Sequence, residues 1–137
     1  MIGILVVAHG KFAEGLIDNS ELIVGEQKNI DYVSLNSGDS IDEFDLNVEN
    51  KIFELVNEEG LIIFTDIYGA TPFNSCCRVI SNKNIVNKIK IISGVSAPML
   101  ITAILERGEN NLDELKELII KSGNEGIKEV FDELGGY

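Results

Sequence analysis

The sequence contains a single histidine, His9, at a position that suggests chemistry. An apolar run over residues 2–8 comes directly before it, and Gly10 directly after it allows the chain to turn. The carboxyl ends of buried strands open into the crevice where α/β sheets bind their ligands. We therefore expect His9 to stand at the working edge of the fold, with its imidazole available as a nucleophile.

A second candidate, Asp66, follows the apolar run of residues 61–65. If the strands that end at His9 and Asp66 are neighbours, the two side chains lie next to each other at the switch point of the sheet. A carboxylate that accepts a hydrogen bond from one ring nitrogen fixes the tautomer and leaves the other nitrogen free to attack. The same carboxylate stabilises the positive charge that develops on the ring. The competing interpretation of Asp66 is a solvated loop acid or a turn cap.

The segment after Asp66 has the composition of a phosphate-binding helix start. Thr71 is a favourable N-cap and Pro72 a favourable first helical residue. The helix would begin at the same sheet edge as His9, where its free backbone N–H groups and positive dipole end can bind a phosphoryl group. Ordinary helix capping explains the same residues without a ligand. The candidate phosphate-binding residues are Gly69, Thr71, Pro72, Phe73 and Asn74.

Other chemistries of histidine and phosphate fit the sequence poorly. Ala8 stands where histidine phosphatases carry an arginine, and the first strand is not followed by the acidic pair of receiver domains. Neither a Walker loop nor the glycine fingerprint of dinucleotide-binding folds is present. With one histidine and no suitable set of cysteines, we predict no metal site. The remaining interpretation is a histidine that accepts a phosphoryl group and passes it on.

The elements that position these residues alternate between strand and helix. The predicted strands are residues 2–8, 30–35, 61–65 and 85–92, and the predicted helices are residues 12–24, 42–57, 71–81, 97–106 and 112–121. Gly123 is expected to stop the last helix, and residues 124–134 have an ambiguous pattern with helical spacing. The alternation predicts a doubly wound α/β fold: a four-stranded, mostly parallel sheet of order 2-1-3-4 with helices on both faces.

The length, charge and hydropathy of the sequence exclude several classes of protein. We expect residues 1–137 to form a single domain, since 137 residues is an ordinary domain size. The net charge of −12 argues against a nucleic-acid partner, because phosphate backbones require a basic surface. The apolar runs are too short to span a membrane, and no signal peptide is recognisable. Together with Cys76 and Cys77, which we expect to be buried and reduced, these features predict a cytoplasmic protein.

Three segments of the chain carry a resemblance to a known family. They read ILVVAHG at residues 4–10, TDIYGATPFN at residues 65–74 and GVSAPML at residues 94–100. In this order and spacing they resemble enzyme IIA of the mannose family in the bacterial phosphoenolpyruvate-dependent sugar phosphotransferase system. Ala70 and Thr71 stand where the family usually has glycine and serine, and Thr71 keeps the hydroxyl group.

The resemblance implies a phosphotransferase that works through a phosphohistidine. His9 would accept a phosphoryl group from the phosphocarrier protein HPr, while Asp66 holds and polarises the ring. The group would then pass to a histidine of enzyme IIB, and from there to a sugar that enters through the membrane components IIC and IID. The resemblance also implies a homodimer, with a C-terminal antiparallel strand exchanged between subunits in some members, and no cofactor.

Alternative functions would use the same edge of the sheet. One is a regulatory domain of the same fold, in which phosphorylation of His9 is a signal. A variant of this is a phosphoryl relay of the type that serves dihydroxyacetone kinase. A third alternative, from a different class, is a flavodoxin-like protein that binds FMN or a nucleotide. The sequence does not identify the sugar, because selectivity in such systems lies in the membrane subunits.

Overall fold

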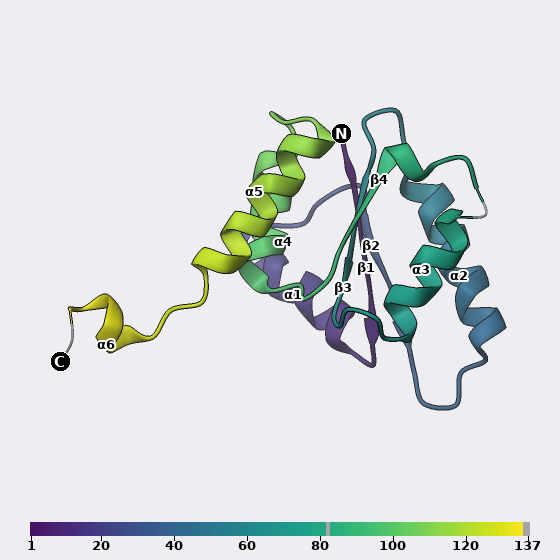
Figure 1. Ribbon diagram of the computed structural model, residues 1–137, viewed down its shortest axis with the longest axis horizontal. Coiled ribbons are helices and arrows are strands. Elements are labelled where there is room, and N and C mark those ends of the chain that lie inside the picture. The colour runs from purple at the N-terminus through teal and green to yellow at the C-terminus, as the bar shows by residue number, and fades with distance from the viewer. Residues whose placement is uncertain (82, 136–137) are drawn as a thin grey trace.

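Four parallel strands form the centre of the computed structural model, which describes residues 1–81 and 83–135. The strands are β1 (Gly3–His9), β2 (Ile30–Leu35), β3 (Leu61–Thr65) and β4 (Ile89–Ile92), in the sheet order β2-β1-β3-β4 (Figure 1). The predicted fold class and strand order are thus confirmed. Because β1 and β3 pair in parallel, their carboxyl ends meet at the same edge of the sheet.

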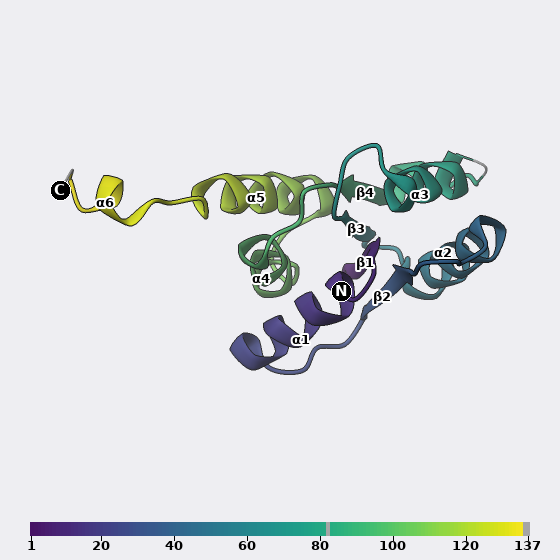
Figure 2. The ribbon, with the colours of Figure 1, turned by 90° about the horizontal axis from the view of Figure 1, so that it is seen from below.

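Helices cover both faces of this sheet (Figure 2). On one face lie α1 (Phe12–Val24), α4 (Ala97–Glu106) and α5 (Leu112–Glu125), and on the other lie α2 (Ile41–Leu55) and α3 (Thr71–Ser81). Side chains of β1 alternate between the two layers: Ile4 and Val6 pack on the first face, Leu5 and Val7 on the second. All four are fully buried, and each such burial contributes about 1.5–3 kcal/mol. The strand that ends at His9 is therefore firmly held.

The last strand begins later than its sequence pattern predicts. Residues Val86–Lys88 form a short 3-10 helix in place of the predicted start of the strand, with the Lys88 N–H donating to the Ile85 carbonyl at 2.9 Å. Val86 is 66% exposed, so it has no core to face. Only Ile89–Ile92 pair with β3, and the prediction of a strand from residue 85 is wrong in its first half.

Gly123 was expected to stop α5, but it lies inside this helix. The helix continues to Glu125, and Met99 of α4 packs directly against Gly123 within it. A Cβ atom at position 123 would lie 2.8 Å from both Cγ and Sδ of Met99. The missing side chain therefore serves close packing between α4 and α5. This contact joins residues far apart in the chain, which is why a local pattern misassigned it.

The C-terminal segment extends away from the rest of the molecule (Figures 1 and 2). It contains a single helical turn, α6 (Val130–Glu133), and its apolar residues are exposed, with Ile127 84% and Leu134 60% accessible. The helical spacing noted for residues 124–134 corresponds to the end of α5 and to α6. The described residues after β4 contain no strand, so this chain by itself does not form the antiparallel strand that the resemblance allowed. No helix in the described ranges combines the length and hydropathy needed to cross a membrane.

A buried arginine connects the start of β1 to the loop before β2. Arg107, directly after α4, is 1% exposed and donates to three backbone carbonyl groups. Nη1 lies 3.1 Å from the oxygen of Ile2 and 3.3 Å from that of Asn29, and Nη2 lies 2.6 Å from that of Lys28. Asn29 has a φ of +56°, which is unusual for a residue with a side chain. The guanidinium thus holds a strained loop against the first strand.

We expect Arg107→Met to lower the free energy of unfolding by about 2–4 kcal/mol, because the buried Ile2 carbonyl loses its donor and the Lys28 carbonyl loses its contact, while the Asn29 carbonyl still accepts the Ile4 N–H. Urea denaturation followed by circular dichroism measures this change. Lys121→Met is the matched control, since Lys121 is 70% exposed in α5 and surface changes of this kind stay within about 0.5 kcal/mol. Equal stability of the two variants would contradict a structural role for Arg107.

Candidate functional site

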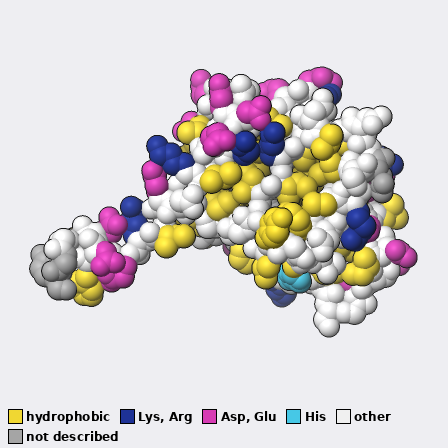
Figure 3. Space-filling model, viewed as in Figure 1, with side chains coloured by type: hydrophobic (Ala, Val, Ile, Leu, Met, Phe, Trp, Pro, Cys, Tyr) yellow, Lys and Arg dark blue, Asp and Glu magenta, His cyan; other side chains and the backbone are white. Residues whose placement is uncertain are grey.

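His9 is the last residue of β1 and projects its ring at the carboxyl edge of the sheet. Residues 3–8 of the strand are buried, whereas the His9 side chain is 45% exposed. Figure 3 shows the imidazole at the surface, with hydrophobic side chains gathered beside it. Gly10 then turns the chain with a φ of +57°, and its N–H donates to the Leu35 carbonyl at 2.8 Å. The placement is the one expected from the strand–histidine–glycine order.

Asp66 directly follows β3 and contacts His9 through both the ring and the backbone. Val7 of β1 pairs with Thr65 of β3, which brings the next residues of both strands together. Oδ2 of Asp66 lies 2.7 Å from Nδ1 of His9 and accepts the His9 backbone N–H at 3.0 Å. The structure therefore brings together the two residues that the sequence analysis selected. Their roles in a reaction stay predictions.

The environment of Asp66 favours its ionised form. Its side chain is 13% exposed, and this burial by itself would raise the pKa of the carboxyl group. The hydrogen bonds from the His9 ring and backbone, with that from the Ile67 N–H at 2.9 Å, outweigh burial and hold the pKa of Asp66 below its usual value. Because an ionised carboxylate only accepts hydrogen bonds, Nδ1 carries the proton in the neutral ring. The lone pair is then on Nε2.

The loop between β3 and α3 is held in place by its own hydrogen bonds. Gly69 has a φ of +78°, a conformation that favours glycine. Nδ2 of Asn74 donates to the Gly69 carbonyl at 2.9 Å, and the Ala70 N–H donates to the Ile67 carbonyl at 3.4 Å. In this chain Asn74, one of the candidate phosphate-binding residues, positions the loop with its amide group.

The range of α3 agrees with the predicted residues 71–81, but its N-cap differs by one residue from the prediction. The helix begins at Thr71, and the Ala70 carbonyl accepts the first helical hydrogen bond, from the Asn74 N–H at 2.9 Å. Ala70 is therefore the N-cap, and the expectation of Thr71 as N-cap is wrong. Pro72, the expected first helical residue, is the second. The shift has a physical cause: Pro72 lacks an N–H, so a helix can begin one residue earlier without losing a bond.

Unpaired backbone donors collect at this edge from two helices. Within the described ranges, the N–H groups of Thr71 and Phe73 in α3 have no hydrogen-bond partner. The same holds in the described chain for the N–H groups of Phe12 and Ala13 at the start of α1, which begins three residues after His9. Both helices direct their positive dipole ends toward the edge that carries His9. The arrangement suits an anion such as a phosphoryl group.

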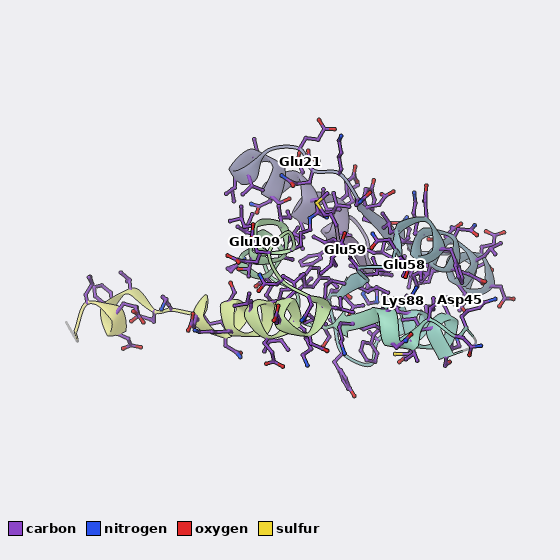
Figure 4. All side chains as sticks on the ribbon, turned by 90° about the horizontal axis from the view of Figure 1, so that it is seen from above. Glu21, Asp45, Glu58, Glu59, Lys88 and Glu109 are labelled. Carbon is purple, nitrogen blue, oxygen red and sulfur yellow. The ribbon has the colours of Figure 1, made fainter. Side chains whose placement is uncertain are left out.

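A polar network that no sequence motif indicates connects α2 to α3. Ser75 is fully buried and donates to Oδ1 of Asp45, which also accepts from Nη2 of Arg78 at 2.9 Å (Figure 4 labels Asp45). Nε of Arg78 donates to Oδ2 of Asp45 at 3.1 Å. These bonds fix the first turns of α3 against α2. Thirty residues separate Asp45 from Ser75, so no local pattern could have linked them.

The two cysteines have different environments. Cys76 is buried, and burial raises the pKa of its thiol to about 12. Cys77 is exposed, which corrects the expectation that both are buried. The two side chains point in different directions because they are adjacent on a helix. Among the described residues, no three His, Cys, Asp or Glu side chains are grouped to hold a metal ion.

The chain is similar to known proteins along most of its length. A sequence model of the family described as "PTS system fructose IIA component" matches residues 3–120. The mannose-specific EIIAB component of Escherichia coli K12 is 29% identical over 128 residues, which cover 93% of this chain and 39% of that protein. The fructose-specific EIIA component of Bacillus subtilis 168 is 25% identical over 84% of this chain and 77% of its own length. This chain thus spans well under half of the EIIAB relative.

Solved structures of phosphotransferase system IIA proteins are also similar to this chain. The phosphotransferase system component EIIA from Streptococcus agalactiae superposes with a TM-score of 0.86 at 30% identity, covering 95% of this chain and 98% of that one. A PTS IIA protein associated with the fucose utilization operon of Streptococcus pneumoniae superposes with a TM-score of 0.85 at 28% identity. That superposition covers 97% of this chain and 96% of the other.

Proposed function

The chain belongs to the fructose and mannose IIA family of the sugar phosphotransferase system, and on this basis we propose that His9 carries a phosphoryl group from HPr to enzyme IIB. The observation that carries the proposal is the 2.7 Å contact between His9 Nδ1 and Asp66 Oδ2 on a ring that is 45% exposed. The contact prepares Nε2 as the nucleophile, and the exposure leaves room for a second protein. Both features are needed for transfer between two histidines.

The proposed step is an in-line transfer between two imidazole rings. The Nε2 lone pair of His9 forms a bond to phosphorus while the P–N bond to the donor histidine breaks, and that electron pair returns to the donor ring. The His9 ring keeps its proton on Nδ1 and becomes positively charged. Asp66, already ionised and hydrogen-bonded to Nδ1, stabilises that charge. In the transfer to enzyme IIB, His9 is the donor. The histidine of enzyme IIB forms the bond to phosphorus, the P–N bond to Nε2 of His9 breaks, and that electron pair returns to the His9 ring.

The phosphoryl oxygens are proposed to lie at the start of α3. The free N–H groups of Thr71 and Phe73 supply donors, and the Thr71 hydroxyl can supply another. Gly69 leaves the approach open, since a Cβ atom there would contact nothing within 4 Å in the isolated chain. Pro72 sets the helical geometry of the first turn, and Asn74 anchors the loop through Gly69. Donors fixed in this way stabilise charge without reorganisation.

The wider assignment follows family membership. We propose that residues 1–137 form a single enzyme IIA domain and that the protein works in the cytoplasm as a homodimer. Its direct partners would be HPr and enzyme IIB, and it would act indirectly with the membrane components IIC and IID. The proposed reaction involves only the two histidines and the phosphoryl group, so it uses no cofactor.

Phosphoryl transfer with purified components tests this proposal. The chain is incubated with enzyme I, HPr and phosphoenolpyruvate labelled in its phosphoryl group, and uptake is followed by gel and by phosphorus NMR. We expect label on Nε2 of His9 and its passage to a cognate enzyme IIB. Absence of label in the presence of phospho-HPr would reject the proposal. Label that reaches no candidate enzyme IIB would favour the regulatory alternative.

A further inference from the structure

Three polar side chains form a closed set of hydrogen bonds between α2 and α3. The hydroxyl of Ser75, which is fully buried, donates to Oδ1 of Asp45 and accepts from Nη2 of Arg78 at 3.1 Å. Arg78 in turn binds both carboxylate oxygens of Asp45, with Nη2 2.9 Å from Oδ1 and Nε 3.1 Å from Oδ2. We call Asp45, Ser75 and Arg78 the α2–α3 clamp. Figure 4 labels Asp45 where the two helices run side by side.

The clamp sets the position of α3 more strictly than apolar contacts do. Hydrophobic burial has no preferred direction, so a helix can rotate or slide slightly while its apolar side chains stay buried. A carboxylate that an arginine binds through two N–H groups allows less movement, because these bonds depend on both distance and angle. Ser75 and Arg78 are three residues apart and thus lie on the same face of α3. Their bonds to Asp45 therefore fix the rotation of α3 relative to α2.

The clamp acts on the turn of α3 that carries the unpaired backbone donors. In an α-helix each N–H donates to the carbonyl four residues earlier, so residue 75 closes the turn that begins at residue 71. The N–H groups of Thr71 and Phe73, which have no partner in the described chain, belong to this turn. The helix advances about 6 Å from Thr71 to Ser75. A shift of α3 at Ser75 would therefore displace both donors.

The clamp holds an acid close to this turn without adding net charge. Burial alone would raise the pKa of Asp45, but the hydrogen bonds from Arg78 and Ser75 outweigh it and hold the pKa below its usual value. Asp45 is therefore ionised, and the guanidinium of Arg78 balances its charge. A neutral pair of this kind does not repel a phosphoryl dianion at the start of α3.

Resting on the proposed function, we propose that the α2–α3 clamp positions the N–H groups of Thr71 and Phe73 for the phosphoryl oxygens during transfer. The three clamp residues are positioning residues, because they act through the backbone of α3 and not on the reacting atoms. Donors fixed in advance stabilise the charge of the transition state without moving, and a displacement of about 1 Å lowers the rate steeply. The clamp therefore affects the chemical step and not the binding of the donor protein.

Initial rates at varied phospho-HPr concentration test the role of the clamp. We expect Asp45→Ala to lower kcat on the order of tenfold. Ser75→Ala should lower kcat less, on the order of threefold, because Arg78 still binds Asp45. KM should stay within about twofold for both variants, since the binding of phospho-HPr is unaffected. The double variant should be no slower than Asp45→Ala, because both changes break the same connection.

The matched control is Glu49→Ala. Glu49 lies one turn after Asp45 on α2, and its Oε1 is 3.1 Å from Nζ of Lys83, which follows α3. This ion pair is about as exposed as that of Asp45 and Arg78, but it joins α2 to the chain beyond the far end of α3. We expect wild-type kcat and KM for Glu49→Ala. Circular dichroism at the assay temperature shows whether each variant is folded, and Ser75→Ala carries the test if Asp45→Ala is not.

Proton–nitrogen NMR spectra give a readout that overall stability does not change. Phosphorylation of the wild-type protein should move the amide proton signals of Thr71 and Phe73 downfield, as new hydrogen bonds to a charged acceptor do. We expect smaller shifts for these two signals in phosphorylated Asp45→Ala, because the donors are no longer aligned with the phosphoryl group. Glu49→Ala should show the same shifts as wild type.

Each other result would overturn the inference. A wild-type kcat for folded Asp45→Ala would show that α3 keeps its position without the clamp. Equal losses of rate in Asp45→Ala and Glu49→Ala would show that contact between α2 and α3 matters in general. A higher KM with unchanged kcat would assign the clamp to the binding of HPr. Failure of the proposed function looks different, because wild type itself would then take no label from phospho-HPr.

Discussion

Replacement of His9 with alanine is expected to reduce phosphoryl uptake from phospho-HPr to background. His9 is the only histidine in the sequence, so no second imidazole can take over the transfer. The fold should persist, because the His9 ring is 45% exposed and the buried side chains of β1 precede it. Asp66 also keeps its hydrogen bonds from the backbone N–H groups of residues 9 and 67. We expect the free energy of unfolding to change by less than about 1 kcal/mol.

Radiolabel from phosphoenolpyruvate, passed through enzyme I and HPr, measures uptake by the His9→Ala variant, and urea denaturation measures its stability. Asn36→Ala serves as a matched control, because Asn36 is exposed and directly follows β2 at the same edge of the sheet. The control should take label like wild type. Phosphorylation of a folded His9→Ala variant would show that another residue accepts the group and would end the assignment of His9.

The second large effect is expected for Asp66→Ala, which should slow transfer on the order of 100-fold or more without abolishing it. Without the carboxylate, either ring nitrogen can carry the proton, and the positive charge that develops on the ring loses its neighbour. Nε2 is still present, so phosphohistidine remains detectable at long times. Asp66→Asn should also be slow, because the neutral amide oxygen can accept a hydrogen bond from the Nδ1–H of His9 but does not balance the positive charge on the ring.

Rapid-quench measurements at fixed phospho-HPr concentration distinguish these cases. Asp18→Ala provides the control, since Asp18 is an exposed acid on α1 that has no contact with His9. Unchanged rates for Asp66→Ala would remove its assigned role. A loss as complete as that of His9→Ala, in a folded protein, would mean that Asp66 does more than orient the ring and stabilise its charge.

The main features of the fold and the site were predictable because they rest on local patterns. Strands of buried apolar residues and helices of the expected lengths alternate along the chain, and alternation of this kind leads to a parallel sheet. This fold gives the strand order 2-1-3-4, which places the carboxyl ends of β1 and β3 at one edge of the sheet. His9 and Asp66 could therefore be paired before any coordinates were known, and the structure places them 2.7 Å apart.

The predictions were wrong where the same residue type or pattern is compatible with two different local structures. Gly123 is of the residue type that typically stops a helix, but it lies inside α5, where Met99 occupies the space of the missing side chain. The predicted bounds of α3 are correct, but its N-cap is Ala70 and not Thr71, because proline is tolerated at either of the first two helical positions. The apolar residues before β4 have the pattern of a strand, but Val86 is exposed and belongs to a 3-10 helix.

The sequence by itself determined which side chains could do the chemistry, since residue type and distance from a strand end are local properties. Only the tertiary structure decided how those side chains are supported. The bonds of Asp45 to Ser75 and Arg78, and of Arg107 to the carbonyls near β1, join residues that lie far apart in the chain. Such contacts depend on how helices pack and on which polar groups packing leaves buried. The periodicity of residue types along the chain does not predict such long-range contacts.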